Sequence, residues 1–178
     1  MGSASFPEDV VLFTSVLFHE NAPVHQAVSL LKDHFGETIL ATSPMPFTYT
    51  SYYHEEMGSP LFRVMLAFDN LVPRDSMPGI KLYTNGIEQA FMVNGKRTIN
   101  LDPGLLSMEN ICLATTKPYS HRIYINQGIW AEVTLIYQGN SFHKLEWTYP
   151  DYASNELIRI FNELRETYRR RRLQCREA

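Results

Sequence analysis

The first quarter of the chain has the hydrophobic pattern of a strand followed by a helix. Val10 to Phe18 is a nearly continuous run of β-forming residues, which predicts a central strand buried on both faces. Asn21 is suited to cap a helix, and apolar residues recur at helical spacing from Val24 to Phe35. Gly36 can end this helix in a left-handed conformation. We therefore expect a buried strand and an amphipathic helix, in this order.

The next segments continue the alternation of strands and helices. Thr38 to Ser43 is strand-like, and Leu61 to Phe68 alternates like a half-buried strand. Residues 47–54 have no clean period and are expected to form a long loop or one irregular turn. From Ile80 to Phe91 apolar residues repeat every three or four positions, which predicts a second helix. A strand around Arg97 to Leu101 would complete a split βαββαβ unit that resembles a ferredoxin-like sandwich.

Three strand-like runs in the last third of the chain are separated by two short loops. The runs are His121 to Ile125, Ile129 to Tyr137 and Ser141 to Trp147. Asn126-Gln127-Gly128 and Gln138-Gly139-Asn140 are both plausible tight loops. This pattern predicts an antiparallel meander, with Ile129, Ala131, Val133, Leu135 and Tyr137 on its core face.

The chain ends with the pattern of an amphipathic helix. Apolar residues between Leu157 and Tyr168 mark one face, and Arg169 to Arg172 would complement the negative end of the helix dipole. Together, the elements predict an α+β fold: a ferredoxin-like βαββα(β) sandwich, extended by a C-terminal antiparallel β-meander and a closing helix.

Length and composition favour a single domain over residues 1–178. A chain of 178 residues with 44% hydrophobic and 20% charged residues matches an ordinary globular protein. The formal net charge of -3 provides no global basic field, so nucleic acid is not expected as a partner. The sequence assigns neither a cofactor nor an oligomeric state.

The expected location is the cytoplasm, and we expect a soluble protein with no membrane partner. The longest apolar run, Val10 to Phe18, is too short to cross a bilayer of roughly 30 Å as a helix. No Lys or Arg precedes this run, so it lacks the charged region of a signal peptide. Cys112 and Cys175 lie far apart and form neither a disulfide framework nor a CxxC motif, which favours a reducing compartment.

The densest run of polar donors extends from Thr115 to Arg122. It contains four hydroxyl groups and three side chains that are or can become cationic. Lys117 and Arg122 could hold a phosphate or a carboxylate, and His121 could donate or transfer a proton near neutral pH. A polar loop that leads into an edge strand would have a similar composition.

The two hairpin loops predict which side chains face one another. If both loops contain three residues, Arg122 lies opposite Glu132, and Glu132 lies opposite Glu146. Two carboxylates beside one arginine could act as acid and base or bind a divalent cation. A purely structural row of ion pairs is the alternative.

A turn is predicted where Asp102 precedes Pro103 and Gly104. It would place Asn100 and Asp102 at the end of a strand, where side chains often face a ligand. Asp102 could instead cap its own turn. Four scattered histidines could bind a metal only if the fold gathered them: His19, His54, His121 and His143.

Several of these segments together resemble a known family. They are Asn100 to Gly104, Ala114 to Lys117, Ser120 to Tyr124, Gly128 to Thr134 and Trp147 to Tyr152. The sequence resembles the uncharacterised bacterial domain-of-unknown-function family 4416 over nearly its whole length. The resemblance implies a bacterial or archaeal cytoplasmic protein and brings no established activity.

Our first hypothesis is an enzyme or binding protein for a small anionic ligand, phosphorylated or nucleotide-like, held in a pocket at the meander. Asp102, His121 and Glu132 are its candidate catalytic residues, with Asp102 or Glu132 as base or metal ligand. The candidate ligand-binding residues are Asn100, Lys117, Arg122, Tyr124, Trp130, Glu146 and Trp147. The alternative is a non-catalytic module that binds protein or RNA through a sheet face or through Arg169 to Arg172.

Overall fold

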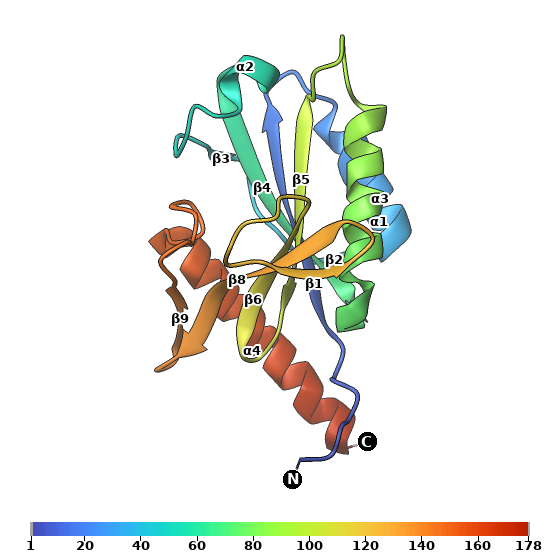
Figure 1. Ribbon diagram of the computed structural model, residues 1–178, viewed down its shortest axis with the longest axis vertical. Coiled ribbons are helices and arrows are strands. Elements are labelled where there is room, and N and C mark those ends of the chain that lie inside the picture. Colours follow the sequence, from blue (N-terminus) through green and yellow to red (C-terminus); the bar gives the residue numbers. More distant parts are fainter. Residues whose placement is uncertain (1, 178) are drawn as a thin grey trace.

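The computed structural model describes residues 2–177, and the side chains of residues 2–174. The side chain of Cys175, considered above, lies outside the described residues. Within the described chain there are four α-helices and one nine-stranded sheet (Figure 1). All paired strands run antiparallel. The α+β class predicted from the sequence is therefore confirmed.

The N-terminal half of the sheet is built around strand β1, the apolar run predicted to be central. β1 pairs with β4 along one edge and with β5 along the other, and β2 and the short β3 pair with β4. The strand order in this half is β2-β4-β1-β5. The bounds are β1 Val10–His19, β2 Thr38–Ala41, β3 Met45–Pro46, β4 Leu61–Val72 and β5 Ile99–Leu106.

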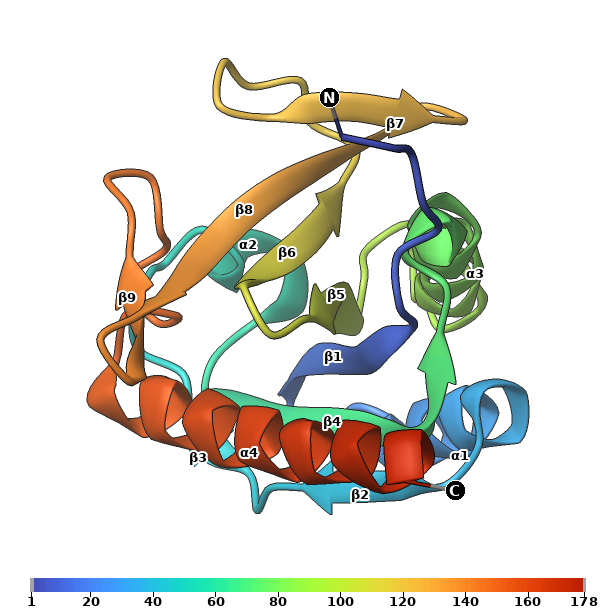
Figure 2. The same cartoon turned by 90° about the horizontal axis from the view of Figure 1, so that it is seen from below.

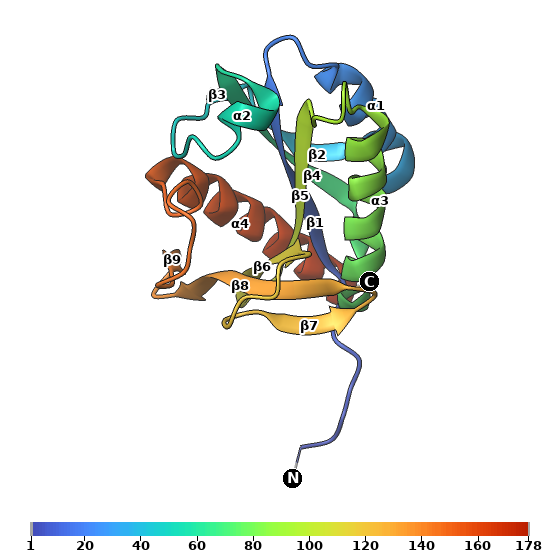
Figure 3. The same ribbon diagram turned by 45° about the horizontal axis from the view of Figure 1, so that its top comes forward.

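Two helices cover one face of this half. They are α1 (Val24–Phe35) and α3 (Met77–Ala90), the latter entered through a short 3-10 turn, η1 (Arg74–Ser76), and they lie side by side in Figures 1 and 3. Their apolar residues pack with those of β1 into one buried cluster. Fully burying one such Leu or Phe contributes about 1.5–3 kcal/mol, so this face fixes both helices against the sheet.

The second half of the sheet continues from β5 through four further strands. Their bounds are β6 Asn110–Thr115, β7 Ile123–Asn126, β8 Ile129–Gln138 and β9 Ser141–Lys144. β6, which is absent from the predicted elements, pairs along one edge of β8. β7 and β9 share the other edge and pair with opposite ends of β8 (Figure 2). Both predicted hairpins are present, but the predicted three-stranded meander is wrong, because β7 and β9 lie on the same edge of β8 and β6 occupies the other edge.

Both hairpin loops are two residues long, so the predicted three-residue loops are wrong. Gln127 and Gly128 connect β7 to β8, and Gly139 and Asn140 connect β8 to β9. All four residues have positive φ, the conformation that tight hairpins require because it matches the twist of the strands. In the first hairpin an irregularity between Tyr124 and Asn126 adds one residue to β7.

A second irregularity changes the faces predicted for β8. The register against β6 shifts by one residue between the pairs Ile111–Leu135 and Cys112–Val133. As a result Ile129 packs in the cluster beneath α1 and α3, whereas Leu135 packs in the cluster on the opposite face. The single core face predicted for β8 is therefore wrong, because a bulge interrupts the alternation of side chains.

The last helix, α4 (Asn155–Glu177), covers the face opposite to α1 and α3 (Figures 2 and 3). Its apolar residues Phe161, Leu164 and Tyr168 are buried against β1, β4, β6 and β8. The closing helix predicted from the sequence is confirmed. The basic run of Arg169 to Arg172 lies within α4 and not at its end.

Candidate functional site

A pocket of about 940 Å³ opens where the two halves of the sheet separate. β5 pairs with β6 only from Gly104 to Leu106, so the outer edge of residues 99–103 has no strand beside it. Three groups provide most of the residues that line the space. They come from α3 and β5, from β6 with the segment after it, and from the segments 47–56 and 149–152, the first of which contains most of the short helix α2 (His54–Met57).

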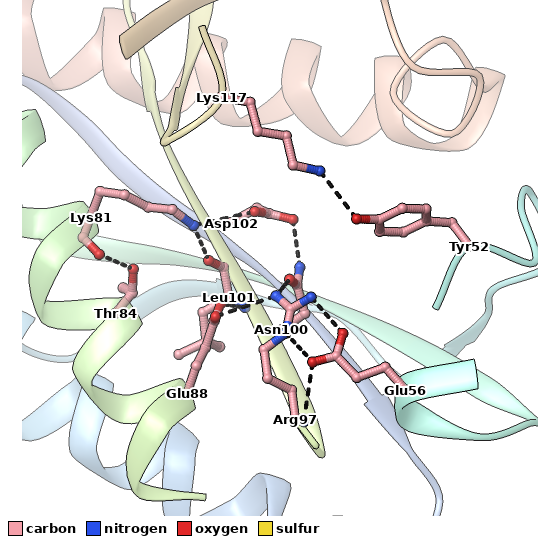
Figure 4. Close-up of polar contacts among 10 residues, drawn as sticks. All are labelled: Tyr52, Glu56, Lys81, Thr84, Glu88, Arg97, Asn100, Leu101, Asp102 and Lys117. Atoms are coloured by element: carbon pink, nitrogen blue, oxygen red, sulfur yellow. Dashed lines mark hydrogen bonds and ion pairs between the residues drawn. The ribbon is translucent and has the colours of Figure 1, made fainter. Parts of the chain in front are cut away.

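Two buried charged side chains of α3 bind the backbone of β5 where no strand pairs with it. Lys81 Nζ donates a hydrogen bond of 2.8 Å to the carbonyl of Leu101, and Glu88 Oε1 accepts one of 2.6 Å from the N–H of the same residue (Figure 4). Buried backbone groups require such partners. Burial raises the pKa of the Glu88 carboxyl, and the Lys81 ammonium opposes this rise.

A chain of polar contacts extends from this point across the pocket floor. Arg97 binds both carboxylate oxygens of Glu56, at 2.8 and 2.7 Å, and donates a hydrogen bond of 2.6 Å to Asn100 Oδ1. Asn100 Nδ2 in turn donates to Asp102 Oδ2 at 2.7 Å, and Lys81 Nζ lies 3.4 Å from Asp102 Oδ1 (Figure 4). The hydrogen bonds from Arg97 hold the pKa of Glu56 below its ordinary value. The floor is therefore ordered before any ligand binds.

The turn predicted at Asp102 is wrong, because Asp102, Pro103 and Gly104 all lie within β5. Gly104 is needed for close packing: a Cβ at this position would lie 2.3 Å from Phe13 Cζ. The predicted proximity to a ligand site does not depend on the turn. Asn100 and Asp102 both line the pocket, and the Asp102 side chain is 37% exposed.

On the opposite wall, Arg122 and Glu132 form a buried ion pair. Arg122 Nε lies 2.8 Å from Glu132 Oε2, and each side chain is only 2% exposed. The predicted contact between the two side chains is confirmed, although Arg122 directly precedes β7 instead of lying within it. The Arg122 guanidinium also donates to the carbonyl of Lys117 at 2.9 Å and to the hydroxyl of Tyr149 at 3.0 Å. Arg122 thus fixes both segments that border this side of the pocket.

His121 and Trp147 lie behind this ion pair. His121 Nε2 is 3.0 Å from Glu132 Oε2, and its ring stacks on Trp147 at a centroid distance of 5.1 Å. Trp147 Nε1 donates to the carbonyl of Val133 at 2.8 Å, which fixes the indole. Neither ring is among the residues that line the pocket. His121 thus contacts Glu132 directly, and Trp147 packs against the His121 ring.

Three further predicted residues lie outside the pocket. The predicted pairing of Glu146 with Glu132 is wrong, because the two-residue loop pairs Gln138 with Ser141 and Glu146 follows the end of β9 in an exposed position. Tyr124 and Trp130 are paired across β7 and β8, with their rings edge to face at 5.4 Å. Neither ring lines the pocket.

Lys117 is the exposed cation of the pocket. Its Nζ lies 3.4 Å from the Tyr52 hydroxyl and 4.9 Å from the centre of the Tyr52 ring (Figure 4). Among the described side chains, Lys117 has no carboxylate within ion-pair distance. The other cations that line the pocket each have one, and they are Arg63, Lys81, Arg97 and Arg122. The Lys117 charge is therefore the least compensated of the described set.

Comparison with known proteins identifies the family of this chain. The domain-of-unknown-function family DUF4416 matches residues 8–168. The chain belongs to this family. No curated protein and no solved structure matches it. The site of this DUF4416 protein must therefore be interpreted from its own residues.

Several pocket residues were absent from the sequence prediction, notably Glu56, Lys81, Glu88 and Arg97. Lys81 and Glu88 are each 7% exposed and lie two helical turns apart, beside the apolar stripe of α3. Charged residues that recur at this spacing next to an apolar stripe are the signal that could have identified them.

The described part of this DUF4416 protein contains no group of three or more His, Cys, Asp or Glu side chains that could hold a metal ion. The four histidines considered above are not gathered: His19 approaches the carbonyl of Ser59, and His143 approaches that of Gln138. Among residues 2–177, no helix is both long enough and apolar enough to cross a membrane.

Proposed function

We propose that this DUF4416 protein binds a small anionic ligand, phosphorylated or nucleotide-like, in the pocket between β5 and β6. The observation that carries this proposal is the position of Lys117, an exposed cation on the border of a pocket of about 940 Å³. No carboxylate among the side chains of residues 2–174 lies within ion-pair distance of it. An incoming anion would displace only the 3.4 Å contact with Tyr52. Pockets of this size accept ligands as large as a nucleotide.

The groups around Lys117 support an anionic ligand. Thr115, Thr116 and Tyr119 line the same border and carry hydroxyl groups that can donate to a phosphate oxygen. Burial raises the pKa of the Tyr53 hydroxyl, so this group remains a donor at neutral pH. The tyrosine rings of residues 49–53 offer apolar surface for the rest of the ligand.

The candidate catalytic residues differ in how they could act. Glu132 already accepts hydrogen bonds from Arg122 and Thr134 and contacts His121, so we assign it and His121 to positioning the Lys117 segment. Asp102 is part-exposed in the pocket and remains the candidate base. Arg122 would act on the ligand mainly through the segments that it fixes.

The test is ligand binding to the wild type and to Lys117→Ala, measured as the shift in thermal midpoint with orthophosphate and a panel of phosphorylated metabolites and nucleotides. Lys144→Ala is the matched control, because it removes an equal charge from an exposed position on β9. We expect at least one anion to raise the midpoint of the wild type and of Lys144→Ala but not of Lys117→Ala. If no anion distinguishes the variants in this way, the proposal is wrong.

The alternative, a module that binds RNA or protein through Arg169 to Arg172, has less support. Arg169 and Arg170 both pair with Glu166, while Arg171 pairs with Asp69 and Arg172 with Glu8. Each charge of this run is thus partly compensated, which weakens an electrostatic patch for phosphates.

We also propose that the first half of the chain is a ferredoxin-like sandwich and that the protein is cytoplasmic. The strand order β2-β4-β1-β5, with α1 and α3 on the same face, supports the first of these proposals. The free thiol of Cys112 supports the second, because it fits a reducing compartment.

A further inference from the structure

We infer that the ligand is a phosphate ester of a polyol, with two neighbouring hydroxyl groups bound at Asp102 and Lys81 and its phosphate bound at Lys117. This inference rests on the proposed function and adds the chemistry of the uncharged part of the ligand. It follows from the donors and acceptors on the pocket floor and from the distribution of charge between the two walls.

Asp102 and Lys81 present an acceptor and a donor side by side. Both line the pocket, with 3.4 Å between Lys81 Nζ and Asp102 Oδ1. A carboxylate has about four acceptor sites, and the described contacts of Asp102 use two of them, toward Lys81 and Asn100. An ammonium has three N–H groups, and Lys81 directs two of them to Leu101 and Asp102. One donor and two acceptor sites therefore remain for a ligand.

A hydroxyl group fits this pair better than an ammonium group does. A hydroxyl both donates and accepts, so two neighbouring hydroxyls can donate to Asp102 and accept from Lys81. A ligand ammonium bound to Asp102 would lie close to the Lys81 ammonium and be repelled by it. The amides of Asn85 and Gln89 line the same wall and can also donate to and accept from hydroxyls.

The charges of the two walls orient such a ligand. The floor combines three carboxylates, of Glu56, Glu88 and Asp102, with two cations, of Lys81 and Arg97. The opposite wall has the reverse balance, since Lys117 and Arg122 accompany the single carboxylate of Glu132. The remaining charged residues of the lining, Arg63 and Asp151, pair with each other. A phosphate is therefore favoured at Lys117, and hydroxyls are favoured at Asp102. Figure 4 shows Lys117 and Asp102 reaching toward the same space from different elements.

A ligand of this kind could be a free sugar phosphate or the ribose phosphate of a nucleotide. Isothermal titration calorimetry with two matched pairs of probes distinguishes these two sources. The first pair is ribose 5-phosphate and 2-deoxyribose 5-phosphate, and the second is adenosine 5′-monophosphate and its 2′-deoxy form. The two members of each pair differ by one hydroxyl of the diol. Binding of the nucleotide pair alone would identify a nucleotide ligand, and binding of the sugar pair would show that the base is not required.

For the pair that binds, we expect the wild type to prefer the diol by about 10-fold or more, the effect of one hydrogen bond to a charged group. Asp102→Asn should remove this preference, whereas Asp33→Asn, which removes an exposed carboxylate from α1, should retain it. Lys117→Ala should weaken both members of the pair by the same factor and leave their ratio unchanged.

Different results would overturn the anion site and the polyol inference. If both members bind the wild type equally and binding depends on Lys117, the polyol inference is wrong and the anion site stands. A preference that survives Asp102→Asn also overturns the inference. If neither pair binds, the polyol inference is wrong, and the midpoint shifts with orthophosphate and the rest of the panel then decide the proposed function separately. The wild-type comparison is decisive even if Asp102→Asn does not fold.

Discussion

Replacing Arg122 by Met should destabilise the protein strongly, because it leaves the Glu132 carboxylate buried without its arginine partner. Both side chains are 2% exposed, and the change removes hydrogen bonds of 2.8, 2.9 and 3.0 Å to Glu132, Lys117 and Tyr149. At about 1 kcal/mol for each bond the loss is about 3 kcal/mol. Removing one partner of a buried pair generally costs about 3–5 kcal/mol, in agreement with this sum.

Urea unfolding followed by tryptophan fluorescence measures this loss, and thermal unfolding should show a midpoint lower by about 6–20 °C for a chain of this length. The double variant Arg122→Met/Glu132→Leu should be more stable than Arg122→Met, because it removes the unpaired carboxylate. Arg159→Met is the control: its partner Glu163 and Arg159 itself are more than half exposed, so the loss should stay within about 0.5 kcal/mol.

Two results would refute this reasoning. A loss below about 1 kcal/mol for Arg122→Met would mean that water or His121 replaces the guanidinium, and the ion pair would not fix the Lys117 segment. A double variant as unstable as the sum of the two single changes would show that the charges of Arg122 and Glu132 are not coupled.

Three further changes test other parts of the structure. Gly104→Ala should lower the free energy of unfolding in urea by about 1–3 kcal/mol or more, because the added Cβ would overlap Phe13. An unchanged free energy would contradict this packing. Because burial raises the pKa of Glu88, the folded state holds this proton more tightly, and the stability of the wild type relative to Glu88→Gln should fall as pH rises from about 4.5 through the raised pKa. A difference that is equal at pH 5 and pH 8, or that grows, would refute this sign. Burial raises the pKa of Cys112 to about 11, so native alkylation at pH 8, measured on its peptide by mass spectrometry, should be about 100-fold slower than in urea. Equal rates would place the thiol at the surface.

The register of Arg122 and Glu132 could be predicted even though the loop length was wrong. A two-residue turn with one extra residue in β7 gives the same pairing of Tyr124 with Trp130 as a three-residue turn without a bulge. The second hairpin has the same turn and no bulge, so there the prediction for Glu146 fails by one residue. Turn residues are readable from the sequence, whereas a bulge depends on the twist that the neighbouring strands impose.

Asp102-Pro103-Gly104 shows how tertiary context overrides a local turn signal. Leu101 directs its N–H toward Glu88 and its carbonyl toward Lys81, both away from β1, and by alternation Pro103 has the same orientation. The backbone nitrogen of Pro103, which carries no hydrogen, thus faces the unpaired edge of β5, where its missing N–H interrupts no strand pairing. Strand β6, by contrast, contains a readable run of four apolar residues, Ile111 to Ala114, that the predicted elements omit.

The separation of β5 from β6 explains why the pocket and its buried charges occur together. Once β6 leaves β5 at Gly104, the backbone of Leu101 needs a donor and an acceptor from elsewhere. α3 provides both from Lys81 and Glu88, and because side chains alternate across a strand, Asn100 and Asp102 share one face of β5 beside them. The spacing of Lys81 and Glu88 within α3 can mark them as candidates, but it does not reveal their partner, because the unpaired backbone that they bind lies in β5. The pocket floor is therefore a consequence of sheet topology, and ligand chemistry at Asp102 depends on groups that first serve to complete the fold.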